Sequence, residues 1–245
     1  MTVPILWASG LAEAGPRPPF DPGDLTLDDA NWEVEVGFGK GRFLRRSALG
    51  RPGVNFLGIE IVGEYFREVA RLARRDRLSN LVVVRAEALY LLAAVLPRAF
   101  ANAVHVYFPD PWPKARHQRR RLFDATTVDL VVGLLKPGAT LFFATDFMTY
   151  GETVEALLES YPGLRVERRG SDWEDGPRTN YEAKYVREGR TFVRLTATRV
   201  PARMSPHPRG ERELAVAFRQ TDSKLPEAEH AIFRSTVRDE QARRA

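Results

Sequence analysis

Short apolar segments alternate with longer amphipathic ones through the first two thirds of the chain. The apolar segments predict strands at residues 32–36, 54–59, 81–84, 103–108 and 140–144, and the amphipathic segments predict helices at about 40–49, 62–77, 87–96, 119–135 and 149–160. Short buried strands that alternate with helices are typical of βαβ units around a parallel sheet. The triplet Lys136-Pro137-Gly138 predicts the end of a helix just before the last of these strands.

The pattern changes after residue 161. Segments 164–169 and 191–198 predict an antiparallel pair of strands on either side of a polar loop, residues 170–184. We therefore expect one α/β domain over residues 31–200, with a mostly parallel sheet and an antiparallel edge. Residues 1–30 are rich in Pro, Gly and Asp and predict an irregular lead-in. Residues 201–245 predict a C-terminal extension, a linker followed by helical pieces at 211–219 and 226–244, and nothing in the sequence shows its role.

The amino-acid composition excludes several kinds of chemistry but does not identify a function. The chain has 245 residues and no cysteine, which excludes disulfides, thiolate metal sites and cysteine nucleophiles. The four histidines show no metal-ligand spacing, so we expect no metal. The first 15 residues lack the positive charge of a signal peptide, and no apolar run approaches the length of a bilayer span. We therefore expect a cytoplasmic protein with no membrane partner.

The formal net charge is +5, and only five of the 37 basic residues are lysine. Arginine suits phosphate groups and stacks on bases, so this preference favours a nucleic-acid partner. Genomic base composition or heat adaptation explains the same preference equally well, and the charge alone does not decide between them.

A glycine-rich turn follows the first predicted strand, in the sequence Glu35-Val36-Gly37-Phe38-Gly39-Lys40-Gly41. Gly37 and Gly39 allow the backbone to approach a ligand at the carboxyl end of a parallel strand. The spacing is one residue shorter than the dinucleotide fingerprint, and the carboxylate of Glu35 is unsuited to a pyrophosphate. Both features favour a cationic ligand such as S-adenosylmethionine over NAD. The alternative is a tight turn with a structural role only.

Two further acidic residues follow the next two predicted strands. Glu60 comes nineteen residues after Gly41, where a carboxylate can accept hydrogen bonds from both ribose hydroxyls. Glu87 follows the third strand, where the adenine amino group is usually recognised. The alternatives are a solvated strand-end side chain for Glu60 and a helix-capping side chain for Glu87.

The most informative segment is the loop after the fourth predicted strand. Pro109, Pro111 and Pro113 stiffen the loop and position Asp110 and Trp112 between them. Residues 114–121 then carry five positive charges and no negative one. A rigid acidic and aromatic loop next to an arginine run suits a site that grips a nucleobase while adjacent phosphates are held. A solvated helix face would explain the charge run, but it leaves the rigid loop unexplained.

The sequence Phe-Pro-Asp-Pro-Trp-Pro-Lys-x-Arg-His-x-x-Arg-Arg that starts at Phe108 resembles the hallmark of the bacterial tRNA (guanine-N7-)-methyltransferase family, TrmB. The resemblance covers residues 32–199 and includes the Glu35 to Gly41 turn, Gly58-Ile59-Glu60, Asn80 leading to Glu87, Ala144-Thr145-Asp146, Thr179-Asn180-Tyr181-Glu182-x-Lys184 and Gly189-x-x-Phe192. It implies a Rossmann-like class I S-adenosylmethionine-dependent methyltransferase. It also implies that the chain methylates guanine 46 in the variable loop of tRNA, with N7-methylguanine and S-adenosylhomocysteine as products.

The resemblance also implies roles for individual residues. Those at the positions of donor contacts are Glu35, Glu60, Glu87 and Asp110, and Asp110 is also at the catalytic position. Those at the positions of substrate contacts are Lys114, Asp146, Thr179, Asn180, Tyr181 and Glu182. Those in the RNA-interacting run are Arg116, His117, Gln118, Arg119, Arg120 and Arg121. The family usually has aspartate at the position of Glu87, and the extension after Pro201 has no counterpart in the family pattern.

The chemistry of guanine supports the role of Asp110. N7 carries an in-plane lone pair and no proton, so methyl transfer needs no obligatory general base. A carboxylate beside the base can accept hydrogen bonds from N1–H and the exocyclic amine, and it stabilises the positive charge that develops. Most of the acceleration then comes from positioning N7 on the methyl carbon.

Two alternatives remain open at the level of sequence. One is a methyltransferase for another nucleic-acid base, because Asp110-Pro111-Trp112 loosely resembles the Asp-Pro-Pro-Tyr loop of amino-methylating enzymes. The other is a non-catalytic RNA-binding protein on the same fold. The identity of the methylated atom distinguishes the first, and binding of the methyl donor distinguishes the second. The choice between monomer and homodimer, and the tRNA species bound, also stay open.

Overall fold

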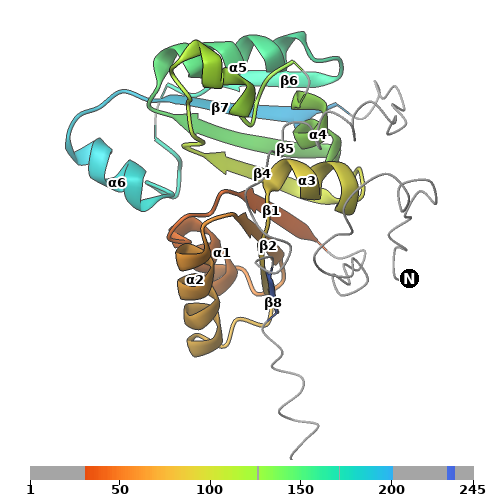
Figure 1. The fold of residues 1–245 in the computed structure, drawn as a ribbon, viewed down its shortest axis with the longest axis vertical. Helices are drawn as coiled ribbons and strands as arrows, with labels where there is room; N and C mark the ends of the chain where they lie inside the picture. The colour runs from red at the N-terminus through yellow and green to blue at the C-terminus, as the bar shows by residue number, and fades with distance from the viewer. Residues whose placement is uncertain (1–30, 126, 171, 201–230, 235–245) are drawn as a thin grey trace, which may run out of the picture.

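Eight strands form one sheet in the part of the chain that the structure describes (Figure 1). The structure is a computed structural model that describes residues 31–125, 127–170, 172–200 and 231–234. The strands are β1 (Trp32–Val36), β2 (Asn55–Glu60), β3 (Leu81–Arg85), β4 (Ala101–Tyr107), β5 (Leu135–Thr145), β6 (Leu164–Arg168), β7 (Val193–Arg199) and β8 (Ala231–Arg234). Their order across the sheet is β6-β7-β5-β4-β1-β2-β3-β8.

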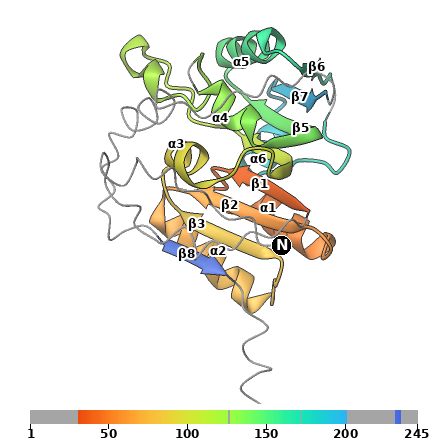
Figure 2. The ribbon, with the colours of Figure 1, turned by 90° about the vertical axis from the view of Figure 1, so that its right-hand side faces the viewer.

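The direction of the strands confirms the predicted fold class. The five strands from β5 to β3 pair in parallel, whereas β7 is antiparallel to both β5 and β6. The predicted antiparallel pair is therefore present as β6 and β7. The antiparallel strand β7 lies one place in from the edge, and β8 pairs antiparallel with β3 at the opposite edge (Figure 2).

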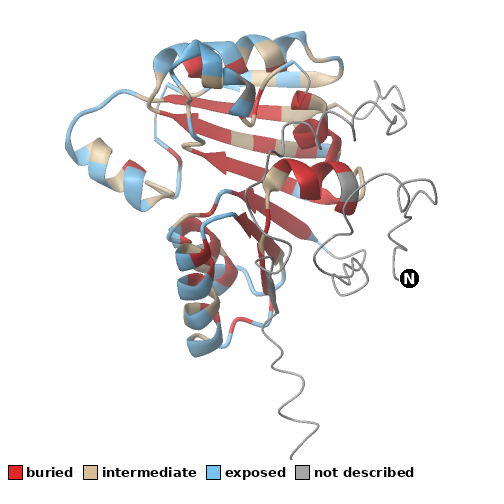
Figure 3. Cartoon of the chain, viewed as in Figure 1, coloured by how far each residue is buried: buried red, intermediate tan, exposed pale blue. Residues whose placement is uncertain are grey.

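Alternation along the strands sorts side chains onto the two faces of the sheet. On β1, Val34 and Val36 join the larger apolar cluster on one face, while Glu33 and Glu35 lie on the other face. The face with the larger cluster is covered by α3 (Ala88–Tyr90), α4 (Val128–Gly133) and α5 (Met148–Ser160). The opposite face is covered at β2 and β3 by α1 (Arg42–Gly50) and α2 (Gly63–Arg75). Figure 3 shows the resulting buried layer along the strands.

Gly58 allows α1 to approach the sheet closely. A Cβ atom at Gly58 would lie 2.4 Å from Leu44 on α1 and 2.7 Å from Phe38 in the preceding turn. No larger residue fits there unless the side chains of Leu44 and Phe38 move.

Several predicted helices and boundaries were wrong. The predicted helix 87–96 is a single α-helical turn, α3, that continues as a π-helical turn, Leu91–Val95. The predicted helix 119–135 is replaced by a 3₁₀ helix, Ala115–Arg120, and by the short α4. Strand β5 starts at Leu135 instead of after Lys136-Pro137-Gly138, because Leu135 already pairs with Ala101. The next pair is Ala103 with Thr140, so residues 136–139 bulge out of β5 and shift its register with β4.

Two segments expected to have one structure have another. The predicted polar loop 170–184 contains the start of helix α6 (Asn180–Arg187), which lies beyond the carboxyl ends of β4 and β5 in Figure 1. The predicted helical piece 226–244 contains strand β8, because its backbone adds to the free edge of β3. The lead-in 1–30, the predicted helix 211–219 and the rest of the extension lie outside the described residues. Among the described helices, none has the length and apolar character needed to cross a membrane.

Candidate functional site

A pocket of about 510 Å³ opens at the carboxyl ends of β1, β2, β3 and β4. Four residues predicted for the donor site line it, one at or just after the end of each of these strands: Gly37, Glu60, Glu87 and Asp110. Apolar side chains such as Ile59 and Leu89 complete its walls. Parallel strands end at the same edge of a sheet, and for this reason residues far apart in the sequence meet here.

The glycine turn and Glu60 form one hydrogen-bonded unit. Gly37, Gly39 and Gly41 all have positive φ angles, which side chains with a Cβ rarely adopt. The turn brings the N–H of Gly39 to 2.8 Å from Oε2 of Glu60, and Oε1 accepts from the N–H groups of Ile61 and Val62, each at 2.9 Å. Because each carboxylate oxygen can accept two hydrogen bonds, Glu60 keeps acceptor capacity for a ligand in the pocket.

Glu35 lies on β1, two residues before Gly37, and does not itself line the pocket. Its side chain is 2% exposed, and Oε2 has no hydrogen-bond partner. Burial raises the pKa of Glu35 well above the ordinary range, and the nearby Glu60 carboxylate raises it further. Burying an unpartnered carboxylate is costly, so this group suits a cationic ligand that would supply the missing donor.

Glu87 caps a helix and also faces the pocket. Its side chain accepts a hydrogen bond from the N–H of Tyr90 at 2.8 Å, which caps α3, and the residue also lines the pocket. Burial raises the pKa of this carboxyl, and the backbone N–H groups of Tyr90 and Leu89 oppose that rise.

The loop that carries Asp110 is held at both ends. The N–H of Phe108 donates to the carbonyl of Ala144 at 2.7 Å, and Nε of Arg121 donates to the carbonyl of Pro111 at 2.8 Å. Phe108 and Trp112 have φ angles of 54° and 39°. Such left-handed conformations of bulky residues are strained and persist only where the surroundings impose them. The fixed loop places the exposed carboxylate of Asp110 on the pocket wall.

The basic run after this loop divides into exposed and buried parts. Lys114, Arg116, Gln118 and Arg120 are exposed, and His117 is half-buried. The guanidinium of Arg120 lies 5.1 Å from the ring centroid of Trp112, and both residues line the pocket.

Arg121 differs from the rest of this run. Its guanidinium is buried and lies 4.8 Å from the ring of Tyr150, in addition to its hydrogen bond to Pro111. This position does not fit the predicted RNA contact, and Arg121 instead anchors the loop. The side chain of Arg119 lies outside what the structure describes.

Five of the six predicted substrate residues lie where α6 meets the end of β5, and the sixth, Lys114, lies in the basic run. The hydroxyl of Tyr181 donates to Asp146 at 3.0 Å, and its ring packs 5.0 Å from that of Phe108. Asn180 accepts from Arg42 at 3.4 Å, and Thr179 caps α6 by accepting from the N–H of Glu182 at 2.9 Å.

Glu182 points into the interior rather than to the surface. Its side chain is fully buried, with Arg194 donating to Oε1 at 2.9 Å and the N–H of Arg178 donating to Oε2 at 2.8 Å. A direct substrate contact does not fit this position, so Glu182 supports α6 instead. The Thr-x-x-Glu spacing is a capping-box pattern, and it could have predicted the start of α6 from the sequence.

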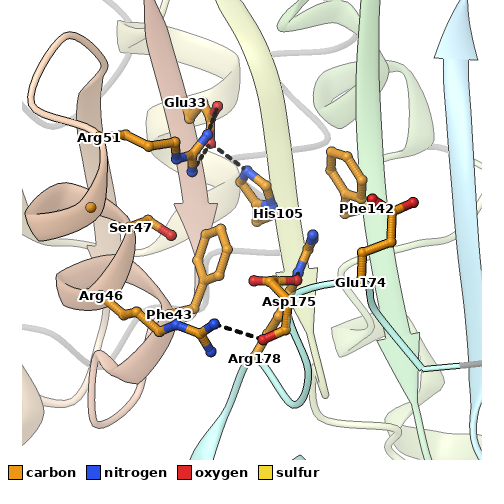
Figure 4. Close-up of a pocket in the computed structure, with 11 residues that line it drawn as sticks. Glu33, Phe43, Arg46, Ser47, Arg51, His105, Phe142, Glu174, Asp175 and Arg178 are labelled. Atoms are coloured by element: carbon orange, nitrogen blue, oxygen red, sulfur yellow. Dashed lines mark hydrogen bonds and ion pairs between the residues drawn. The ribbon is translucent and has the colours of Figure 1, made fainter.

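The sequence analysis did not predict the buried polar network beside the pocket. Glu33, His105, Tyr107 and Arg178 are joined by hydrogen bonds on the face of the sheet that also carries Glu35. Figure 4 shows three members of this network, Glu33, His105 and Arg178. His105 lies in the core of the protein and is only 3% exposed. The alternation of glutamate and valine on β1 was the one available signal for polar groups on this face. Within the described ranges, no cluster of three His, Asp or Glu residues is suited to a metal ion.

Comparison with known proteins identifies similar chains. The model of a family described as "Putative methyltransferase" matches residues 29–195. A tRNA (guanine-N(7)-)-methyltransferase of Thiobacillus denitrificans is 34% identical over 193 residues, which cover 74% of this chain and 82% of that protein. A protein of the same name from Nocardia farcinica is 34% identical and is covered to 72%. The one from Nitrosococcus oceani is 34% identical over 156 residues, and only 66% of its length is spanned.

Solved structures similar to this chain include methyltransferases of the same architecture. A 16S rRNA (adenine(1408)-N(1))-methyltransferase from Catenulisporales acidiphilia, in complex with S-adenosylmethionine, has a TM-score of 0.53 at 21% identity and covers 77% of this chain and 94% of its own. An S-adenosylmethionine-dependent O-methyltransferase from Thermotoga maritima has a TM-score of 0.51 at 14% identity, and covers 75% of this chain and 64% of its own. At these identities the similarity shows the fold alone.

Proposed function

This chain belongs to the bacterial tRNA (guanine-N7-)-methyltransferase family, and on that premise we propose that it transfers the methyl group of S-adenosylmethionine to N7 of a guanine in tRNA. The finer proposal is that the target is guanine 46 in the variable loop. One observation supports placing the reaction in this pocket. The fixed loop brings Asp110 into the same pocket as Gly37, Glu60 and Glu87, which lie at the ends of three other strands.

The chemistry of the pocket fits the methyl donor. When bound, S-adenosylmethionine supplies an electrophilic methyl group and carries two positive charges, the sulfonium and the amino group. The unpartnered oxygen of Glu35 suits the amino group, and the remaining acceptor site on Oε2 of Glu60 suits a ribose hydroxyl. Glu87 reaches the same pocket and is proposed to recognise adenine. Gly37 and Gly39 allow the donor to approach the backbone of β1.

Asp110 is proposed to act on the base rather than to remove a proton. Its carboxylate accepts hydrogen bonds from N1–H and the exocyclic amine of guanine, which orients N7 toward the donor. The negative charge also stabilises the cationic purine as it forms, so the interaction strengthens in the transition state. Because the loop is already fixed by Ala144 and Arg121, little ordering is needed when the base binds.

The RNA is proposed to bind across the mouth of this pocket. Trp112 and Arg120 offer a ring and a guanidinium next to Asp110, and Lys114, Arg116 and Gln118 continue the exposed basic run. Asp146 and Tyr181 lie on the other side of Phe108 and extend the surface toward α6.

The proposal is tested by incubating the purified chain with unmodified tRNA and S-adenosylmethionine labelled in the methyl group. Digestion to nucleosides should yield labelled N7-methylguanosine. Borohydride and aniline cleavage, which acts at N7-methylguanosine, should map the label to the variable loop, and a transcript with adenine in place of guanine 46 is the matched control. Label on adenosine, or bound donor with no transfer to any RNA, would refute the proposed reaction.

A further inference from the structure

Arg178 lies immediately before Thr179, Asn180 and Tyr181, the substrate-facing segment that the family resemblance implies. Its guanidinium lies among four aromatic rings, 4.5 Å from the centroid of Trp173, 4.8 Å from Phe142, 5.5 Å from Phe43 and 5.8 Å from Tyr107. These rings come from α1, β4, β5 and the segment after β6. The planar guanidinium of arginine suits such a box, and the more compact ammonium of lysine does not.

The polar contacts of Arg178 tie two functional segments together. Nη1 donates to the hydroxyl of Tyr107 at 2.6 Å, and Nε pairs with Asp175 at 3.0 Å. The backbone N–H of Arg178 donates to the buried Glu182, one turn into α6. Tyr107 is the last residue of β4 and lines the donor pocket, directly before the loop that carries Asp110.

The directions of these hydrogen bonds are fixed by chemistry. Arginine can only donate, so the hydroxyl of Tyr107 accepts from Arg178 and offers its own proton to Nδ1 of His105, 2.9 Å away. Burial lowers the pKa of His105 although Glu33 opposes this, which favours the neutral ring. The remaining ring proton then lies on Nε2 and faces Glu33 at 3.0 Å, where Arg51 also donates.

Other connections between this segment and α1 are weaker. A pocket of about 370 Å³ lies between α1 and residues 174–178. Figure 4 shows the residues that line it. Arg46 spans it with a hydrogen bond of 2.7 Å to the carbonyl of Asp175, and Arg42 reaches Asn180 at 3.4 Å. Both of these contacts are exposed, and exposed polar contacts contribute little to holding a segment in place. Arg178 is 14% exposed, so its interactions are far less screened.

We propose that Arg178 is a positioning residue that holds the substrate-facing segment in a fixed place relative to Tyr107 and the Asp110 loop. This inference rests on the proposed function and adds a residue to it. Removing the guanidinium should leave the donor pocket intact, because Glu60, Glu87 and the glycine turn are held by their own backbone hydrogen bonds. It should displace the segment that contacts RNA, and small displacements of a positioning group can cost about 100-fold in rate.

The test compares Arg178→Met with Arg178→Lys. Methionine keeps the apolar packing in the box, and lysine keeps the charge. For both variants, kcat/KM for tRNA methylation should fall about 10–100-fold. The Kd for S-adenosylhomocysteine, measured by calorimetry, should change less than threefold. Because the role depends on the plane of the guanidinium, lysine should not restore activity.

Arg169→Met is the matched control. Arg169 also stacks on Trp173, at 5.8 Å, but its ion pair is with Glu174, so this variant should keep its kcat/KM for tRNA. Retention of activity within threefold in either Arg178 variant would overturn the positioning role. So would a loss matched by equal losses of donor affinity and thermal stability, because that pattern indicates general unfolding. A wild-type chain that forms no N7-methylguanosine would instead refute the proposed function, and the positioning role with it.

Discussion

Replacing Glu35 by glutamine should weaken donor binding and stabilise the free protein at the same time. The two effects have one origin, a buried carboxyl group with an unpartnered oxygen. In the free protein this group is destabilising, because burial and the adjacent Glu60 both disfavour its charged form. In the complex, the ammonium group of the donor would supply the missing partner.

The size of the binding effect follows from the contact that is lost. A hydrogen bond to a charged group contributes about 1.5–3 kcal/mol, so Glu35→Gln should raise the Kd for S-adenosylmethionine by a factor of about 10–150. The wild-type group must lose its proton to bind a cation, and donor binding should therefore release protons. Calorimetry between pH 5 and 8, in buffers of different ionisation enthalpy, should detect this release in the wild type and not in Glu35→Gln.

The stability effect depends on pH in a defined direction. The pKa of Glu35 is raised in the folded state, so the wild type loses stability as the pH rises above about 4.5, where the unfolded chain ionises. Glutamine removes this loss, and the advantage of Glu35→Gln in urea unfolding should be larger at pH 8 than at pH 5.

Glu33→Gln is the matched control on the same face of β1. Burial alone would raise the pKa of Glu33, but hydrogen bonds from His105 and Arg51 outweigh it and lower the pKa to about 2. This variant should destabilise the protein and leave donor affinity unchanged. The proposed role of Glu35 would be refuted if Glu35→Gln bound the donor as tightly as the wild type. It would also be refuted if Glu35→Gln and Glu33→Gln changed the free energy of unfolding in the same direction.

Three further predictions concern the base, the RNA and the buried network. Asp110→Asn should lower kcat about 100-fold, the effect of about 3 kcal/mol from one lost charge stabiliser, with tRNA binding retained in filter binding; near-normal turnover would contradict the role. Arg120→Ala should reduce the slope of log Kd for tRNA against log salt concentration by about one, without loss of stability. Arg121→Ala should instead lower the free energy of unfolding by about 1–3 kcal/mol. If the two variants had the same effects on tRNA binding and on stability, the division of the basic run into exposed and buried parts would be refuted. The stability advantage of the wild type over Glu33→Gln, about 3 kcal/mol at pH 7 from the lowered pKa, should fade as the pH falls from 4.5 toward 2, and urea unfolding at each pH measures it.

Local patterns were sufficient for the strands and for most of the pocket. Parallel strands must end at one edge, so the positions of Gly37, Glu60, Glu87 and Asp110 after four successive apolar segments already predicted that they meet. The same reasoning failed for Arg121. A run of arginines predicts uniformly exposed side chains. Only the positions of Pro111 and Tyr150 in the folded protein show that Arg121 is buried.

The segment after β6 shows the limit of local reasoning. Its polar composition predicted a loop, although Thr179 and Glu182 have the spacing of a capping box. The helix α6 is fixed there by Arg194, a residue on β7 that lies twelve positions later in the sequence than Glu182. Contacts at that separation do not appear in any short window of residues.

By itself, the sequence determined the α/β class, the order of strands and helices up to β5, and the ring of acidic residues around the donor pocket. These features depend on periodicity and on turn residues, which act over a few neighbouring positions. The tertiary structure alone decided which charges are paired. Glu33 and Glu35 are two residues apart on the same face of β1, yet the pKa of one is lowered and that of the other is raised. The difference arises because Arg51 and His105 reach Glu33, whereas one oxygen of Glu35 has no partner among the residues the structure describes.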